Sequence, residues 1–259
     1  MSPFLAGLAG ILIVLFLLFL GFPIGFTMAL IGFLGLWFLV NFAAAFHVIS
    51  TLPYEILNNF DFLVIPLFLF MASICLNSGL GERMFNFAYK LTGRMPGGLT
   101  VGTITACGVF SAISASSIAT AVTIGSAAIP EMRRYNYDEG VATGAVAAGG
   151  TLGALLPPST ILIIYGILTQ TSIAKLFIAG VIPGIILTLL FILMVYVRAR
   201  RNPSLAPPGR SYSLKEKIES AIDCFEIFIL IAVVLVGIIL GWFTPTEAGG
   251  VAAFGSILV

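Results

Sequence analysis

The chain consists mostly of long apolar stretches separated by short polar ones. A hydrocarbon core about 30 Å thick needs roughly 20 helical residues to cross it. Stretches of about this length predict membrane-spanning helices at 3–20, 23–41, 62–79, 140–169, 176–197 and 225–242. A further apolar segment begins at Ala248 and is cut off at Val259, so we expect the sequence to be a piece of a longer protein.

The basic residues predict which side of the membrane each polar stretch occupies. All of them except Lys175 fall in three stretches, and the loop at 41–60 contains none. The three groups are Arg83, Lys90 and Arg94; Arg133 and Arg134; and Arg198, Arg200, Arg201, Arg210, Lys215 and Lys217. Because cytoplasmic loops are enriched in Lys and Arg, we expect these stretches in the cytoplasm and both the 41–60 loop and the N-terminus outside.

Residues 99–129 are rich in Gly, Ala, Ser and Thr. If this stretch crossed the membrane once, the basic loop at 198–217 would lie outside. Two helical arms of about 15 residues would each span about 23 Å, too short for two full crossings. We therefore predict a re-entrant hairpin that opens to the cytoplasm, with its tip near 111–117 and small residues between closely packed arms. A single tilted span with a small-residue face is the alternative.

The next apolar segment is interrupted by Gly149 and Gly150 and by Pro157 and Pro158. A proline has no N–H, so the carbonyls of Gly153 and Ala154 lose their intrahelical partners. A sodium ion, a water or a facing hydroxyl could replace them. Ser111 and Ser114, three residues apart in the hairpin tip, are candidate hydroxyls. A plain proline kink, with hydroxyls bonded to their own helix, is the alternative. Broken helices beside a hairpin are typical of secondary-transporter binding sites.

The segment before the predicted hairpin has an amphipathic pattern. Within 82–98, one helical face carries Met84, Phe87, Ala88 and Leu91. This pattern predicts an interfacial helix that could brace the hairpin; a plain cytoplasmic linker helix is the alternative.

Two short segments of the sequence resemble each other. Both join two apolar helices through a proline turn: GFPIGFTMALIGFLG at residue 21 and GWFTPTEAGGVAAFG at residue 241. With opposite predicted orientations, they suggest an inverted repeat.

Composition narrows the class of protein. Hydrophobic residues make up 59% of the 259 residues and charged residues 9%, against about 25% charged in soluble domains. The net charge of +1 offers no basic surface for nucleic acid. The single histidine and the absence of GxSxG and HExxH motifs disfavour an enzyme. We predict an all-α polytopic membrane protein, with an ion channel as a rival that could also use freed carbonyls.

Several blocks of the sequence resemble a known family. They are FDFLVIPLFLFMASICLNSGLGERMF, GRMPGGL, FSAISASSIATAVTIGSAAIPEM, GALLPPSTILIIYGILTQTSIAKLFIAGVIPG and GWFTPTEAGG. They are similar to the large membrane subunit of tripartite ATP-independent periplasmic (TRAP) transporters. Where that family often has Ser-Gly-Ser at the hairpin tip, this chain has Ser114, Ala115 and Ser116.

The resemblance implies an elevator-type transporter of the ion transporter superfamily, with inverted repeats, in the bacterial inner membrane. A periplasmic binding protein would deliver an organic acid such as a C4-dicarboxylate or sialic acid. A small membrane subunit would complete the scaffold, and the sodium gradient would drive symport. A sodium/anion symporter of similar fold that needs no binding protein is the nearest alternative.

The resemblance also implies site residues and a division of the chain. The sodium ligands would be the hydroxyls of Ser111 and Ser114 and the carbonyls of Gly153, Leu156 and Pro158. Further candidates for the ion or the substrate carboxylate are Ser116, Ser117, Thr120, Gly150, Thr151 and Ser159. The expected parts are scaffold helices at 1–61, a helix and interfacial arm at 62–98, the hairpin and broken helix at 99–175, a helix and cytoplasmic linker at 176–224, and the start of the second repeat at 225–259.

Overall fold

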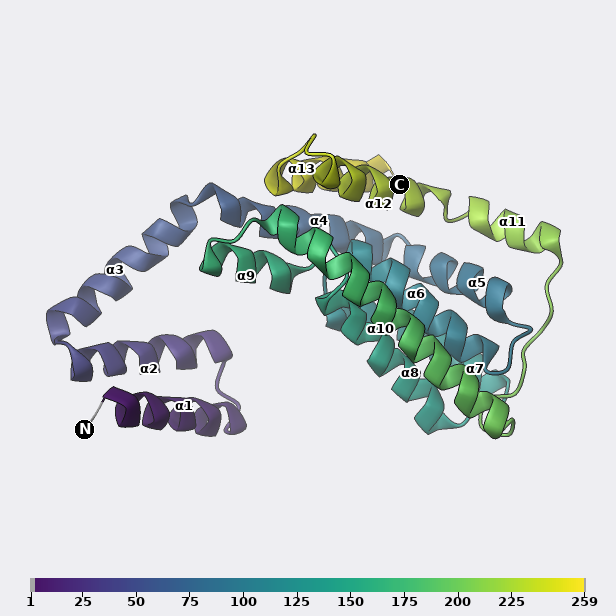
Figure 1. Ribbon diagram of the computed structural model, residues 1–259, viewed down its shortest axis with the longest axis horizontal. Coiled ribbons are helices and arrows are strands. Elements are labelled where there is room, and N and C mark those ends of the chain that lie inside the picture. Colours follow the sequence, from purple (N-terminus) through teal and green to yellow (C-terminus); the bar gives the residue numbers. More distant parts are fainter. Residues whose placement is uncertain (1–2, 259) are drawn as a thin grey trace. The chain divides into compact units, whose positions relative to one another are not determined.

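The computed structural model describes residues 3–258, and every regular element among them is a helix (Figure 1). The chain divides into two compact units, residues 1–60 and 61–259. The first unit contains α1 (Pro3–Phe19), α2 (Ile24–Leu39) and α3 (Phe42–Asn58). The predicted all-α class is confirmed for the described residues.

The predicted loop at 41–60 is wrong, because most of it forms α3. Asn41 caps this helix: its side-chain oxygen accepts a hydrogen bond from the N–H of Ala44 at 2.7 Å. The rings of Trp37 and Phe42 meet edge to face, with centroids 5.3 Å apart. A segment that is too polar to count as a membrane span can still be helical, and an asparagine cap followed by apolar residues favours a helix.

The short helix η1 (Phe60–Leu63) crosses the boundary between the two units. After it, the second unit contains ten α-helices and one further short helix among the described residues. They are α4 (Val64–Asn77), α5 (Leu80–Thr92), α6 (Gly98–Ser114), α7 (Ser117–Arg134), α8 (Glu139–Thr151), η2 (Leu152–Ala154), α9 (Thr160–Thr169), α10 (Ile173–Arg201), α11 (Leu214–Ile222), α12 (Phe225–Ile239) and α13 (Pro245–Leu258). The segment expected at 140–169 is broken into α8, η2 and α9, as its glycines and prolines predict.

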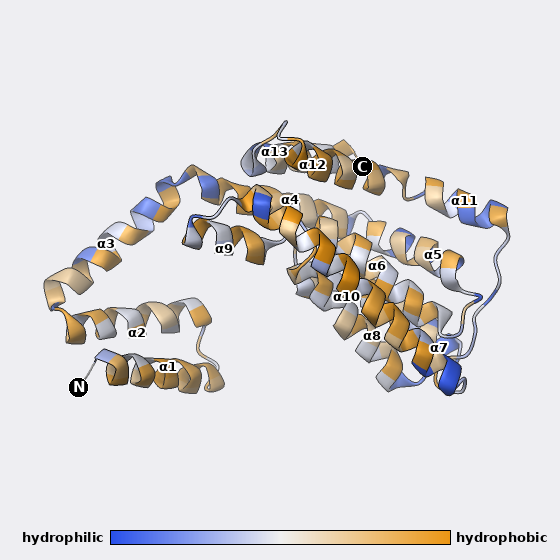
Figure 2. Cartoon of the chain, in the orientation of Figure 1, coloured by the Kyte–Doolittle hydropathy of each residue, from blue (hydrophilic) through white to orange (hydrophobic). Residues whose placement is uncertain are grey.

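Membrane crossing can be judged by helix length and hydropathy. Among residues 3–258, Phe60–Asn77 and Ile173–Arg201 are each long and apolar enough to span a membrane. α11 and α12, bent by 55°, could together form a third span. α1 and α2 are apolar but contain 17 and 16 residues, slightly fewer than the roughly 20 of a full crossing. Figure 2 shows the apolar character of α10, which ends in a hydrophilic last turn.

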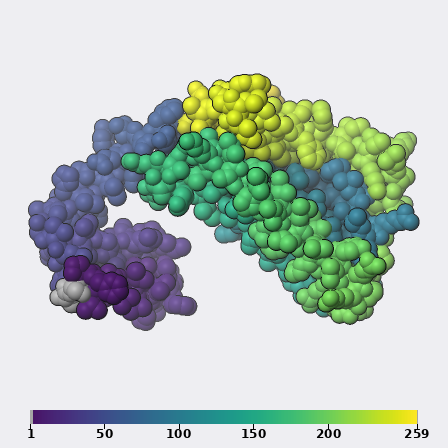
Figure 3. All heavy atoms as spheres, in the orientation of Figure 1, coloured from purple at the N-terminus to yellow at the C-terminus, as the bar shows by residue number. Residues whose placement is uncertain are grey.

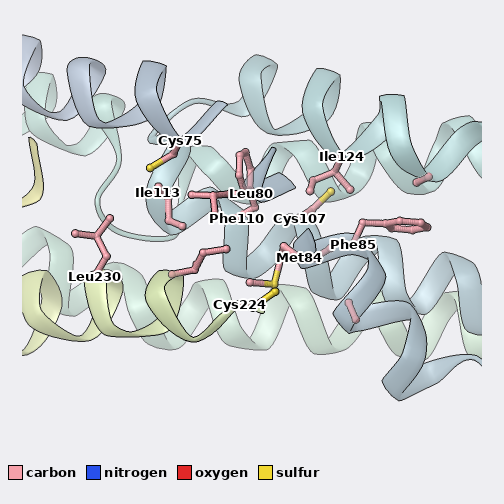
Figure 4. Close-up of a cluster of buried hydrophobic side chains, with 14 of the residues drawn as sticks. Cys75, Leu80, Met84, Phe85, Cys107, Phe110, Ile113, Ile124, Cys224 and Leu230 are labelled. Atoms are coloured by element: carbon pink, nitrogen blue, oxygen red, sulfur yellow. The ribbon is translucent and has the colours of Figure 1, made fainter. Parts of the chain in front are cut away.

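The core of the second unit lies where α4, α5, α6, α7 and α12 meet. Figure 4 shows its side chains, among them Cys75, Phe110, Ile124 and Cys224, which are almost completely buried. Lipid is as apolar as these side chains, so close packing rather than removal from water must hold membrane helices together. Small residues make that packing possible: a Cβ added to Gly149 of α8 would lie 2.8 Å from the sulfur of Cys107 in α6.

The arm helix α5 exists, but its buried face differs from the predicted one. Leu80, Met84, Phe85, Ala88 and Tyr89 are buried, whereas Leu91, expected on that face, is exposed. α5 packs against both α6 and α7, so the hairpin rather than a lipid surface selects the buried face. Contact with both arms agrees with the predicted bracing role.

The two proline turns that suggested a repeat share their backbone conformation. Gly21 and Gly241 both have positive φ, +85° and +74°. In each turn the next residue donates a hydrogen bond five residues back: Phe22 N–H to the carbonyl of Leu17, and Trp242 N–H to that of Gly237. This is a glycine-based helix ending that residues with a Cβ rarely adopt. The two turns thus share a local conformation that is common at helix ends, and both the duplication and the opposite orientation of its copies stay predictions.

Candidate functional site

The predicted hairpin is formed by α6 and α7, which fold back on each other. Tyr137, just beyond α7, joins both ends of the hairpin to the rest of the unit. Its hydroxyl accepts a hydrogen bond from the N–H of Leu99 at 3.3 Å and donates one to the carbonyl of Pro207 at 2.7 Å. The start of one arm therefore lies beside the end of the other, and the alternative of a single tilted span is wrong. That the hairpin is re-entrant stays a prediction.

The tip of the hairpin is the two-residue turn at Ala115 and Ser116, inside the range expected for it. Ala115 is left-handed, with φ of 49° and ψ of 14°. Ser116 caps α7 by accepting a hydrogen bond from the N–H of Ala119 at 3.4 Å. Across the turn, the hydroxyls of Ser114 and Thr120 are hydrogen-bonded at 2.5 Å, and that of Ser114 also donates to the carbonyl of Ser116 at 3.2 Å. The turn thus gathers two buried hydroxyls and a carbonyl.

The predicted helix break contains freed carbonyls, one of which finds a hydroxyl. The Ser159 side chain donates to the carbonyl of Ala154 at 2.8 Å, so a facing hydroxyl satisfies that group. Within residues 3–258, the carbonyls of Gly153, Leu156 and Pro158 accept no hydrogen bond. These are the three carbonyls expected to ligate sodium, and oxygen atoms of this kind suit a hard cation. The peptide bond between Pro157 and Pro158 is cis.

The hairpin tip and the helix break contact each other. A Cβ on Gly153 would lie 3.0 Å from the backbone of Ser116 and Ser117, so only a glycine fits without displacing the turn. The carbonyl of Ala115 accepts two hydrogen bonds from Thr160, from its hydroxyl at 2.9 Å and from its N–H at 3.4 Å. The two features that the sequence identified separately therefore form one site.

The candidate residues are distributed unevenly around this contact. Ser111 is buried, and among the described residues its hydroxyl bonds only to the carbonyl of Gly108 in its own helix, at 2.7 Å. The Thr151 hydroxyl is exposed and bonds back to Ala148 at 2.6 Å. The side chain of Leu156 packs against Gly184 of α10, and Gly150 lies against Ala121 of α7. Ser114, Ser116, Thr120 and Gly153 lie at the contact itself.

Sequence reasoning missed Thr160, which anchors the hairpin tip. It is the first residue of α9, two positions after the double proline. The N-cap of this helix is Ser159, and the hydroxyl of Thr160 bonds outside its own helix, so capping rules do not point to it. Its partner is a backbone carbonyl 45 residues away, which no pattern in the sequence specifies.

The opposite end of the hairpin is tied down by the segment that follows α10. Backbone hydrogen bonds join Gly97 to Ala206 at 3.2 Å and Asp138 to Leu205 at 3.0 Å, and the N–H of Gly209 donates to Gly93 at 2.9 Å. The loops that carry most of the basic residues thereby meet at one end of the unit, in agreement with their predicted placement on one side. Arg83 is an exception. It lies in the first turn of α5, at the end of that helix opposite to these loops, and pairs with Glu226 of α12 at 4.0 Å.

Burial also affects the chemistry of this end. Tyr137 lies in the loop between α7 and α8, and removal from water raises the pKa of its hydroxyl to about 12. The neutral hydroxyl is the form that can donate to Pro207, and the raised pKa extends the pH range of this form beyond the ordinary value of 10.0.

An apolar helical unit in which a hairpin tip contacts a broken helix has the architecture of a membrane transport protein. Comparisons with known proteins identify the family. Residues 11–259 match the family described as tripartite ATP-independent periplasmic transporter, DctM component. The chain belongs to this family, which confirms the resemblance noted in the sequence.

Individual relatives agree with this assignment. The chain is 39% identical over 206 residues to the C4-dicarboxylate TRAP transporter large permease protein DctM of Pseudomonas aeruginosa, which covers 80% of this chain and 48% of the relative. It is 34% identical over 250 residues to the sialic acid TRAP transporter large permease protein SiaM of Vibrio cholerae, which covers 94% of this chain and 56% of the relative. The chain thus spans about half the length of these relatives.

Proposed function

We propose that this chain forms the first part of the large permease of a sodium-coupled transporter that takes up an organic acid across the bacterial inner membrane. The observation that carries the proposal is the contact between the hairpin tip and the helix break, in a chain of the DctM family. Its relatives include permeases named for C4-dicarboxylates and for sialic acid, so we expect a carboxylate substrate.

The coupling ion would bind at this contact. Ser114 and the carbonyl of Gly153 lie on the two sides of it, and Leu156 and Pro158 offer further carbonyls without partners within the described residues. Ser111 would complete the expected set through its hydroxyl oxygen, whose lone pairs can still face an ion while the O–H donates to the carbonyl of Gly108. Such a neutral set suits a monovalent cation, because it avoids the cost of burying carboxylates in the membrane.

Partners follow from the same proposal. A periplasmic substrate-binding protein would deliver the acid, a small membrane subunit would complete the scaffold, and the hairpin region would move in an elevator mechanism. The N-terminus would be periplasmic and the basic end of the hairpin cytoplasmic, as the distribution of Lys and Arg predicts. Two alternatives are a symporter that needs no binding protein and an ion channel.

Uptake into proteoliposomes tests the proposal. The complete permease would be reconstituted with its membrane partner, and uptake of labelled succinate or sialic acid would be measured with and without a sodium gradient and the binding protein. We expect uptake only when both are present. Uptake without the binding protein would favour the symporter, and ohmic current without substrate would favour the channel. Sodium-independent uptake would overturn the coupling.

The ion site has its own test. Replacing Ser111 and Ser114 by alanine should raise the sodium concentration for half-maximal uptake about tenfold, which is roughly 1.4 kcal/mol of lost binding. Ser126→Ala is a matched control, since this exposed α7 hydroxyl bonds only to the carbonyl of Thr123 within the described residues. Unchanged sodium dependence in the double variant, with normal membrane insertion, would reject the site.

A further inference from the structure

A cavity opens at the side of α10, well away from the hairpin tip. It has a volume of about 650 Å³ and lies between the loop after α5, the C-terminal half of α10 and the start of α11. Its lining includes Leu189, Ile192, Leu193, Tyr196, Arg94 and Lys217. These residues come from three separate segments, so only the folded unit creates the cavity.

One end of the cavity is apolar. Leu189 and Leu193 stand on α10 with 58% and 55% of their surface exposed, and Ile192 lies between them. Figure 3 shows α10, in green, open along its length on this face of the unit. α10 is also one of the helices long enough to cross a membrane, so its exposed leucines would meet acyl chains.

The other end of the cavity is basic. Arg94 and Lys217 approach it from different segments, and neither forms an ion pair among residues 3–258. None of the described residues that line this cavity is acidic. Tyr196 lies between the apolar and basic ends, where the amphipathic ring of a tyrosine is favoured at a membrane interface. The adjoining cavity on α10 shares Leu193 and also ends in arginines, Arg198 and Arg201.

We propose that this cavity binds one anionic phospholipid, with its phosphate at Arg94 and Lys217 and an acyl chain along Leu189 and Leu193. The change from apolar to basic runs from Leu189 to Tyr196, a rise of about 10 Å, which matches the junction between acyl chain and head group. Basic pockets between membrane helices on the cytoplasmic side suit anionic head groups. A closely packed protein helix would instead favour small residues, which this face of α10 lacks.

Lipid retention by the purified permease tests the site. Native mass spectrometry would compare phosphatidylglycerol with phosphatidylcholine of the same acyl chains. Each basic residue near an anionic group is worth about fivefold in affinity, so Arg94→Gln with Lys217→Gln should weaken phosphatidylglycerol binding about 25-fold. Arg133→Gln with Arg134→Gln removes the same charge from the α7 end and should leave binding unchanged. Equal binding of both lipids, or equal loss in both double variants, would overturn the proposal.

A photo-crosslinker identifies the occupant directly. A photoreactive amino acid in place of Leu193, in the complete permease in native membranes, should crosslink to lipid and to little protein. A crosslink to another segment of the permease or to a partner subunit would show that protein fills the cavity, and would overturn the proposal. Thermal unfolding of each variant, compared with the parent protein, shows whether it has folded and keeps the binding results interpretable.

Discussion

The backbone N–H of Leu99 donates a hydrogen bond to the hydroxyl of Tyr137, 38 residues later, at 3.3 Å. Leu99 is at the start of the first hairpin arm and Tyr137 follows the end of the second, so this bond closes the hairpin at its base. The same hydroxyl donates to Pro207, which ties the hairpin to the segment after α10. One side chain thus sets the position of three segments.

Removal of this hydroxyl should destabilise the protein. Tyr137→Phe leaves the N–H of Leu99 buried without a partner, and an unsatisfied buried group costs about 1–3 kcal/mol. We expect a lower melting temperature for the purified permease, measured by differential scanning fluorimetry. Tyr165→Phe removes an exposed hydroxyl from α9 and should have little effect. Equal melting temperatures for the two variants would contradict the bridge.

The same bridge predicts a dependence on alkaline pH. The pKa of Tyr137 is about 12 in the folded protein, above its ordinary value of 10.0. Folding therefore favours the protonated hydroxyl, and its contribution to stability is complete below pH 10 and is lost as the pH rises towards 12. The difference in unfolding free energy between the parent and Tyr137→Phe should be constant from pH 7 to 9.5 and shrink above pH 10. A difference that grew with pH would contradict this sign.

Gly153 should not tolerate a side chain. In Gly153→Ala the new methyl group would lie 3.0 Å from the backbone of Ser116 and Ser117 and would push the hairpin tip from the break, at a cost of about 1–3 kcal/mol. Gly144→Ala, in the middle of α8, meets no atom within 4 Å and should stabilise the helix by about 0.5–1 kcal/mol. Melting temperatures that shift in opposite directions are expected. If both variants had lower melting temperatures, the loss of stability would be due to added side chains along this helical segment and not to the contact of Gly153 with the hairpin tip.

Ala115 should be replaceable by glycine with a gain in stability. Its φ of 49° is a left-handed conformation that costs a residue with a Cβ about 1–2 kcal/mol. Ala115→Gly relieves this strain and loses only one buried methyl group, so we expect a net gain of about 0.5–1 kcal/mol. Ala119→Gly, inside α7, should lose a similar amount. Chemical unfolding in detergent would compare them, and a loss for both would argue against a left-handed turn.

The start of α11 should depend on the charge of Glu216. Hydrogen bonds from the backbone and hydroxyl of Ser213 lower the pKa of this carboxylate from its ordinary value of 4.5. The cap is therefore fully formed above pH 4.5 and is lost as the pH falls through the lowered pKa. Glu216→Ala should increase amide hydrogen exchange in α11 severalfold at neutral pH, whereas Glu219→Ala, later in the helix, should not. Equal exchange in both would contradict the capping box.

The sequence predicted many elements because their signals are local. Apolar runs identified most of the helices, and the two prolines at 157 and 158 identified the break. The hairpin followed from a longer-range argument, since the basic residues on both sides of 99–129 had to lie on one side of the membrane. The segment at 41–60 was predicted as a loop because it is not a long apolar stretch, although Asn41 is a helix cap. The buried face of α5 was only half right, because its neighbours, and not its own periodicity, decide which side is covered.

The sequence by itself determined most of the helical segments, the break at Pro157 and Pro158 and the freed carbonyl of Gly153, since each follows from the chemistry of a few neighbouring residues. Only the tertiary structure decided that Thr160 holds Ala115, that Gly153 lies against Ser116, and that Tyr137 joins Leu99 to Pro207. These contacts join residues tens of positions apart, and they depend on how closely small side chains allow helices to approach, which local patterns do not encode.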